Sequence, residues 1–266
     1  LYFFCHTLSM VELSAKFPVL CLERGFLAYR IGNYSLAIQE WADLAKDGNP
    51  IAEFSLGMMY FKGQGVKKNY KIAIEWYTLS AKKGNEFAQY NLGWMHGHGL
   101  GVIRDYKTAA KWYFLAAEHG HADAQYNLGL FYKMGQGVRK DYEIAVKWYR
   151  LSAKQGNARA QHNLALMYQS GNGVLKDYEA AVYWYGRSAR QGTKNAQINL
   201  AHMYFTGLGV KKNYICAYIW WRIAKENGVR NINNNIVTVR ERMTPREIIH
   251  ADKLVADYLN KISSEY

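Results

Sequence analysis

A glycine–valine pair returns every 36 residues along most of this chain, with no insertion between copies. The glycines of these pairs are Gly65, Gly101, Gly137, Gly173 and Gly209. A tyrosine keeps the same spacing over a longer stretch, at Tyr34, Tyr70, Tyr106, Tyr142, Tyr178 and Tyr214. Strict repetition at a period of this length is typical of stacked structural units, so the sequence predicts about six consecutive repeats.

Each repeat contains two stretches with helical periodicity. In the copy around Asp141, small and apolar residues follow at helical spacing, so Asp141 is the expected N-cap of a first helix. Gly156 ends this helix, because the left-handed conformation that closes a helix favours glycine. A second helical stretch follows and stops at Gly171. The repeat is therefore predicted to be a helix-turn-helix unit.

Several positions hold the same small or large residue in successive repeats. The small ones are Ala37, Ala73, Ala109, Ala145, Ala181 and Ala217 in the first helix, and Ala52, Ala88, Ala124, Ala160 and Ala196 in the second. The large ones are Trp76, Trp112, Trp148, Trp184 and Trp220, with Leu56, Leu92, Leu128, Leu164 and Leu200. Alanine lets helix axes approach closely, and the large side chains fill the remaining space. We expect an all-α solenoid with one continuous core that includes these tryptophans.

The beginning of the chain departs from the repeat. Residues 1–15 form an apolar stretch that ends in small residues, which is a candidate remnant of an export signal. That interpretation favours a periplasmic or secreted location over a cytoplasmic one. Residues 16–33 are predicted to form an N-terminal capping helix, which is compatible with export, and residues 34–227 the repeat array.

Residues 228–266 are predicted to form C-terminal capping helices. Thr244, Pro245 and Glu247 make a capping box, with a proline at the first helical position. The helix that begins there carries one apolar stripe, formed by Ile248, Val255, Tyr258, Leu259 and Ile262. We therefore expect this helix to cover the exposed end of the core.

The repeat resembles a known family. The motif A-x-A-Q-Y-N-L-G runs from Ala122 to Gly129, and G-V-x-x-D-Y-x-x-A-x-x-W-Y-x-x-A-A runs from Gly101 to Ala117. Both are similar to the Sel1-like repeat family, over roughly residues 34–227. The resemblance implies a right-handed α/α superhelix like that of tetratricopeptide arrays, and an adaptor role in bacterial signalling, the envelope or host interaction. One cysteine-rich branch of the family binds or hydrolyses β-lactams, but the cysteine pairs of that branch are absent from these repeats.

Catalytic and cofactor motifs are absent from the sequence. The chain has no G-x-S-x-G elbow, no H-E-x-x-H helix and no phosphate-binding G-K-[ST] loop, so we expect neither catalysis nor a cofactor. Four histidines, His96, His98, His119 and His121, lie close in sequence. A helix separates the two pairs by roughly 20 Å, which excludes one four-histidine metal site and leaves a two-histidine site at either end open. No apolar run reaches the roughly 18 residues of a membrane-spanning helix.

Basic residues also keep the period, in a chain of formal net charge +13. They precede the first helices at Lys67, Lys68, Arg104, Arg139, Lys140, Lys176, Lys211 and Lys212. Such positions are most often solvated turns, but a ridge of positive charge also suits an acidic protein or an anionic lipid surface. Nucleic acid is a weaker alternative, because the aromatic residues are needed in the core and are not free to stack on bases.

A candidate binding surface lies on the second helices. Residues that point away from their inward alanine and leucine positions are Phe54, Met58, Tyr90, Trp94, Tyr126, Leu130, His162, Leu166, Ile198 and His202. Large apolar residues exposed on the inner, concave side of a superhelix would form a groove for a partner peptide. The alternative is that these residues pack against the neighbouring repeat.

The sequence thus favours a non-catalytic scaffold that presents a groove to a partner protein or peptide. Two alternatives remain open, a β-lactam-binding or β-lactam-hydrolysing envelope protein and a basic protein that binds anionic lipid or nucleic acid.

Overall fold

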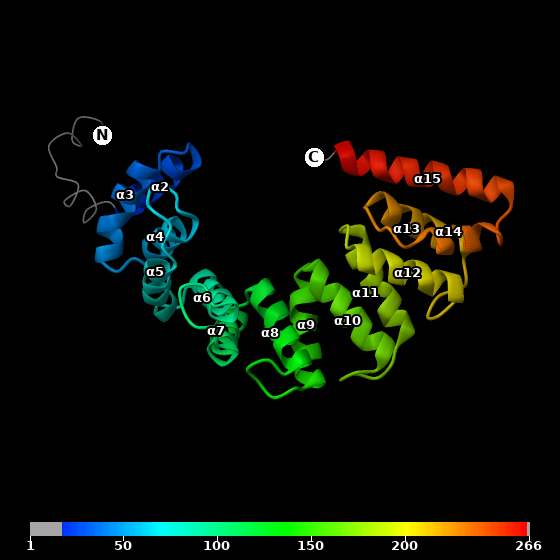
Figure 1. Cartoon of the computed structure of the whole chain (residues 1–266), viewed down its shortest axis with the longest axis horizontal. Coiled ribbons are helices and arrows are strands. Elements are labelled where there is room, and N and C mark those ends of the chain that lie inside the picture. Colours follow the sequence, from blue (N-terminus) through cyan, green and yellow to red (C-terminus); the bar gives the residue numbers. More distant parts are fainter. Residues whose placement is uncertain (1–17, 265–266) are drawn as a thin grey trace. The chain divides into compact units, whose positions relative to one another are not determined.

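The computed structural model describes residues 18–264, and every regular element within them is an α-helix (Figure 1). The first described helix is α2 (Pro18–Arg30). The first helices of the repeats are α3 (Tyr34–Lys46), α5 (Tyr70–Lys82), α7 (Tyr106–Glu118), α9 (Tyr142–Lys154), α11 (Tyr178–Arg190) and α13 (Tyr214–Glu226). The second helices are α4 (Pro50–Lys62), α6 (Glu86–His98), α8 (Ala122–Met134), α10 (Ala158–Ser170) and α12 (Lys194–Thr206), followed by α14 (Asn233–Arg240) and α15 (Pro245–Ser264). The predicted all-α repeat solenoid is confirmed.

The helices form two compact units, unit 1 over residues 1–139 and unit 2 over residues 140–266. Within each unit, the helices from α2 to α14 pack mainly on the helices just before and just after them in the chain. The candidate export remnant, residues 1–15, lies outside the described residues.

The predicted helix ends are present. The carboxylate of Asp141 accepts a hydrogen bond from the amide of Ile144 at 2.9 Å, and Asp177 does the same for Ala180 at 2.9 Å. Gly156 has a φ of 96° just after α9, and Gly171 has a φ of 75° at the end of α10. Only glycine adopts this left-handed conformation without strain, which explains why glycines recur at these positions.

The tryptophan positions do not lie where the sequence suggested. Trp76, Trp112, Trp148, Trp184 and Trp220 are only half-buried. The fully buried aromatic residue stands one position later, as in Tyr77 and Tyr185. Tyr77 lies against Gly57 of the preceding second helix, so closely that a Cβ on Gly57 would be 2.6 Å from the ring. The deepest packing therefore joins a ring of one repeat to a small residue of the repeat before it.

Buried polar side chains also join successive repeats. In α6, the amide nitrogen of Gln89 donates to Ala81 O at 3.1 Å, and its oxygen lies 3.1 Å from His119 Nδ1 in the next repeat. In unit 2, Gln191 donates to Gln161 Oε1 at 2.8 Å and Asn227 donates to Gln197 Oε1 at 3.1 Å, at equivalent positions.

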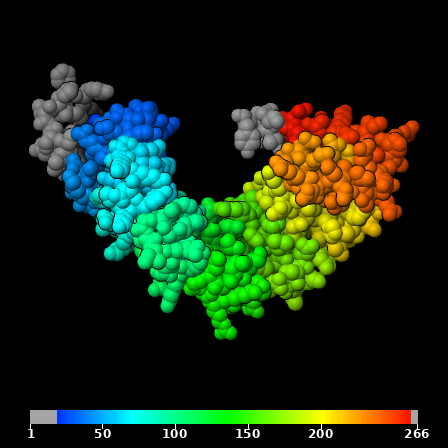
Figure 2. All heavy atoms as spheres, viewed as in Figure 1, coloured from blue at the N-terminus to red at the C-terminus, as the bar shows by residue number. Residues whose placement is uncertain are grey.

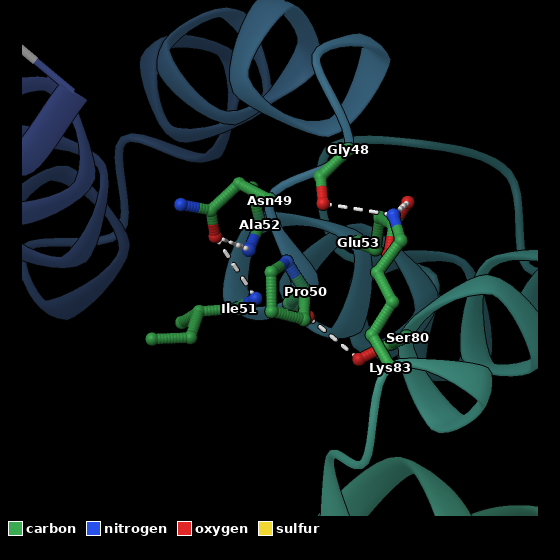
Figure 3. A network of polar contacts seen from close by, with 8 residues as sticks. All are labelled: Gly48, Asn49, Pro50, Ile51, Ala52, Glu53, Ser80 and Lys83. Atoms are coloured by element: carbon green, nitrogen blue, oxygen red, sulfur yellow. Dashed lines mark hydrogen bonds and ion pairs between the residues drawn. The ribbon is translucent and has the colours of Figure 1, made fainter.

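The first of these junctions is ionic (Figure 3). Glu53 replaces the glutamine on α4, and Lys83 Nζ lies 2.5 Å from its Oε1 and 2.8 Å from Gly48 O. Next to it, the hydroxyl of Ser80 donates to Pro50 O at 2.6 Å. These contacts fix the start of α4 against the end of α5.

At the C-terminal end, the predicted capping box is confirmed. Thr244 N donates to Glu247 Oε2 at 2.8 Å, and Glu247 N donates to Thr244 Oγ1 at 3.3 Å. The helix that starts there, α15, packs on α13, and both are visible in the orange-to-red part of Figure 2. Ala251 and Val255 are the buried residues of α15. Of the predicted stripe, Ile248, Tyr258 and Leu259 are half-buried.

Among the described residues, no helix combines the length and the apolar character that crossing a bilayer requires.

Candidate functional site

The predicted binding residues all lie on the second helices of the repeats, and we call this set of residues the second-helix stripe. It consists of Phe54, Met58, Tyr90, Trp94, Tyr126, Leu130, His162, Leu166, Ile198 and His202. Nine of these residues are half-buried, and His202 is exposed. Nine of the ten stripe side chains are therefore partly covered and partly accessible to solvent.

In unit 1 the start of the stripe merges into an aromatic patch, formed by Phe54, Phe87, Tyr90 and His121. The ring centroids of Phe54 and Phe87 lie 6.1 Å apart, and those of Phe87 and His121 lie 5.3 Å apart in an edge-on arrangement. Tyr90 and His121 stack at 4.6 Å with an interplanar angle of 13°. Phe87 is 52% exposed, although it is held on two sides by rings. The patch is a preformed apolar surface that spans the starts of three successive second helices.

Sequence reasoning missed two members of this patch. Phe87 was overlooked because its equivalents in other repeats, such as Arg159 and Asn195, are polar, so no periodic signal marks it. His121 was considered only as a candidate metal ligand. It is the N-cap of α8, and its Nδ1 accepts from the amide of Ala124 at 3.3 Å. A search for aromatic residues near the starts of the second helices would have found both.

The charge state of His121 matters for the patch. Burial lowers the pKa of its imidazole from the usual 6.5, and the nearby carboxylates of Asp123 and Glu86 only partly oppose this effect. Because Nδ1 accepts a hydrogen bond, the neutral ring carries its proton on Nε2. At neutral pH the patch is therefore uncharged and has two carboxylates beside it.

Trp94 belongs to a second aromatic group in unit 1. Its ring lies 5.8 Å from that of Phe61 on the preceding second helix and 4.5 Å from the imidazole of His98. His98 is held by its Nδ1, which lies 2.8 Å from Trp94 O. This packing against the neighbouring repeat is the alternative that the sequence left open, and it explains why Trp94 is half-buried.

In unit 2 the stripe is more polar. His162 lies 5.8 Å from the ring of Tyr185, and its Nε2 is 3.3 Å from Asn199 Nδ2. Leu166 and Ile198 pack against the cores of the following repeats. The described contacts of the stripe in unit 2 are therefore made with one tyrosine ring, one amide and the repeat cores.

The exposed end of the stripe borders a pocket of about 310 Å³ between α12, α13 and α14. Its walls include His202, Phe205, Trp221 and Asn235. Trp221 is buried, and its indole N–H has no hydrogen-bond partner within the described part of the chain.

The periodic basic residues are placed largely by the repeat tyrosines. The cationic groups of Lys68, Arg104, Lys140 and Lys176 lie over the rings of Tyr70, Tyr106, Tyr142 and Tyr178, at 4.8, 5.4, 4.7 and 5.4 Å from the centroids. Such contacts stabilise the start of each first helix by about 0.5–1 kcal/mol at an exposed site. An intramolecular role thus explains why these four basic residues keep the period.

Three of the four clustered histidines make separate contacts. His98 binds a backbone carbonyl, His119 contacts Gln89, and His121 caps α8. Within residues 18–264, no three or more histidine, cysteine or acidic side chains come together as metal ligands would.

Comparison with known proteins finds the same repeat and the same fold in other chains. The family model described as Sel1 repeat matches residues 50–85, 87–121, 122–157, 158–193 and 194–229. A Sel1 repeat protein from Oxalobacter formigenes has a similar structure, with a TM-score of 0.77 and 32% identity over 88% of this chain and 98% of that one. A protective antigen of uropathogenic Escherichia coli with the same repeat fold gives a TM-score of 0.81 and 31% identity over 94% of this chain. The present chain spans 56% of the length of that antigen. A search of curated proteins finds no match.

Proposed function

Because the chain belongs to the Sel1 repeat family, we propose that it is a non-catalytic scaffold that binds a partner protein or peptide along the second-helix stripe. Repeats of this family generally mediate protein–protein contacts. Resemblance to bacterial relatives favours a role in bacterial signalling, the envelope or host interaction.

The observation that carries the proposal is the aromatic patch of unit 1. A phenylalanine that remains 52% exposed while rings hold it on two sides is a rigid apolar anchor, and rigid aromatic anchors dominate protein interfaces. Its conformation requires little further ordering on binding, which lowers the entropic cost of association.

The charges beside the patch favour one kind of partner. Glu86 and Asp123 both act electrostatically on His121, although the whole chain carries a formal net charge of +13. A peptide with an aromatic or long aliphatic side chain next to a lysine or arginine would place its apolar group on Phe87 and its cation near these carboxylates. The apolar contact with Phe87 would supply most of the affinity, and the contact between the cation and the carboxylates would orient the peptide.

The test is selection of a random peptide library displayed on phage against the full chain. We expect enriched peptides to carry an apolar residue beside a basic one, and their affinity to fall at least tenfold on Phe87→Ser. Tyr183→Ser is the matched control, because Tyr183 is an aromatic residue of unit 2 with 54% exposure. Circular dichroism checks that both variants keep their helical content. Peptides that bind wild type and Phe87→Ser equally would refute the assignment.

The alternatives have direct assays. We expect no turnover of a chromogenic β-lactam, since no cysteine pair occurs within the repeats. Binding to phosphatidylserine vesicles should disappear at physiological salt if the basic residues mainly cover tyrosine rings. Persistent vesicle binding that requires Lys67 and Lys211 would favour the anionic-surface function instead.

A further inference from the structure

The repeat that begins at Tyr106 contains a pocket that the second-helix stripe does not line. The pocket has a volume of about 440 Å³ and is formed by residues of α7, of α8 and of the connection that follows α8. Its apolar walls include the buried Leu128 and the exposed Phe114 and Leu115. All of its walls belong to unit 1. The volume falls within the roughly 300–1,000 Å³ that is typical of small-molecule sites.

A small residue opens this pocket. Ala110 is buried, lines the pocket and stands four residues after the repeat tyrosine. The equivalent residues of the other repeats are Ile38, Ile74, Val146, Val182 and Tyr218. Each of these larger side chains is buried or packs against the core of its repeat. Because Ala110 lacks the carbons that occupy this position elsewhere, the space beside it stays open.

Two lysines lie in the wall of the same pocket. Lys107 and Lys111 are four residues apart on α7, and both side chains are exposed. Of the six repeats, only this one has lysine at both positions. No acidic residue lines the pocket, and within residues 18–264 neither ammonium group forms an ion pair with a carboxylate.

This arrangement of charges is unfavourable without a ligand. Like charges four residues apart on a helix repel each other, and Lys107 also lies at the positive end of the dipole of α7. An anion between the two ammonium groups would turn this repulsion into two charge-assisted contacts. The open apolar space and the pair of cations therefore occur in the same repeat and line the same pocket.

We infer that this pocket binds a small amphipathic anion. The apolar body of the ligand lies against Ala110 and Leu128, where its removal from water supplies the affinity. The negative head lies between Lys107 and Lys111, which select an anion over a neutral molecule of the same shape. A carboxylate and a phosphate head share this chemistry. The site is independent of the peptide proposed for the aromatic patch, since none of the patch residues lines it.

Calorimetric titration of the full chain with octanoate, octyl phosphate and 1-octanol tests the inference. We expect at least one of the two anions to bind saturably with one site per chain, and at least tenfold more tightly than 1-octanol. The tighter of the two anions identifies the head group. Absence of saturable binding of both anions up to about 10 mM would overturn the inference, and so would equal binding of the anions and 1-octanol.

Two variants separate the apolar space from the charges. Ala110→Val introduces the residue that Val146 and Val182 provide in the next two repeats, so it should fill the pocket, weaken binding of the anion at least tenfold and leave the thermal unfolding midpoint no lower than that of wild type. Unchanged binding by this variant would show that the anion does not enter the pocket and would overturn the inference.

The double variant Lys107→Gln/Lys111→Gln should lose the preference for the anion over 1-octanol while it keeps the binding of 1-octanol. Lys147→Gln is the matched control, because Lys147 is the equivalent of Lys111 in a repeat where Val146 occupies the space. It should bind the anion as wild type does. Equal losses in the double variant and in Lys147→Gln would point to general attraction by a basic surface and would overturn the inference.

Discussion

Lys83 Nζ lies 2.5 Å from Glu53 Oε1. At the equivalent junction of three other repeat pairs, a glutamine contacts a histidine, a glutamine or an asparagine instead. The side chain of Glu53 is 2% exposed and that of Lys83 is 39% exposed. The second carboxylate oxygen, Oε2, has no hydrogen-bond partner among residues 18–264. This junction therefore depends on one partly solvated lysine to balance a buried charge.

Removal of that lysine should be costly. We expect Lys83→Ala to destabilise the protein by about 1–3 kcal/mol, because it leaves a buried carboxylate unpaired. The double variant Glu53→Gln/Lys83→Gln recreates the Gln161–Gln191 pair and should stay within about 1 kcal/mol of wild type. Urea unfolding of the three proteins measures both values. If the double variant were as unstable as Lys83→Ala, neutralisation of the buried Glu53 carboxylate would not be the way in which Lys83 stabilises the protein.

Two helical glycines should respond in opposite directions to alanine. A Cβ at Gly57 would lie 2.6 Å from the Tyr77 ring, so Gly57→Ala should cost about 1–2 kcal/mol as the ring and helix shift. Gly186 in α11 has nothing within 4 Å of its Cβ position, so Gly186→Ala should stabilise the protein by about 1 kcal/mol through helix propensity. Thermal unfolding of both variants checks the sign. Equal effects would show that close packing does not select glycine at position 57.

The repeat could be predicted from sequence because its signals are local. The glycines and the N-caps each act within one or two helical turns, and the 36-residue period repeats them. The structure confirms these helix ends. The choice between two adjacent aromatic residues depends on the neighbouring repeat. Trp76 and Tyr77 both fit the helical period, but only Tyr77 lies over Gly57, and single-helix periodicity does not resolve about 100° of rotation.

The candidate site was predictable only in outline. The second-helix positions could be identified, since they follow from the inward alanines. Phe87 could not be identified, because the rings that hold it, Phe54 and His121, come close to it only when the repeats stack. The packing of α2 was hidden for a similar reason. Only residues 31–33 connect α2 to α3, whereas residues 63–69 connect α4 to α5, so α2 falls outside the 36-residue period although Gly25 faces Trp41 as Gly57 faces Tyr77.

The capping box of α15 should be measurable as a local effect. Thr244→Ala removes the hydroxyl that accepts from Glu247 N and that contacts its carboxylate at 2.9 Å. Loss of such a cap costs about 1 kcal/mol. Amide hydrogen exchange should accelerate in the first turns of α15 and stay unchanged in α5. Thr244→Ser is the control and should behave as wild type. Uniform acceleration along the chain would argue for global rather than local destabilisation.

Protonation of His121 should weaken the aromatic patch. Burial lowers its folded-state pKa below the usual 6.5, so the unfolded chain binds the proton more tightly. The stability contributed by the neutral ring is present above pH 6.5 and is lost as the pH falls through the lower folded value. Thermal unfolding midpoints of wild type should therefore drop relative to those of His121→Asn as the pH falls below 6.5, since asparagine caps α8 without titrating. A cationic ring also repels a basic peptide, so selected peptides should bind wild type less tightly over the same range. Parallel pH profiles for the two proteins would show that the imidazole does not control the patch.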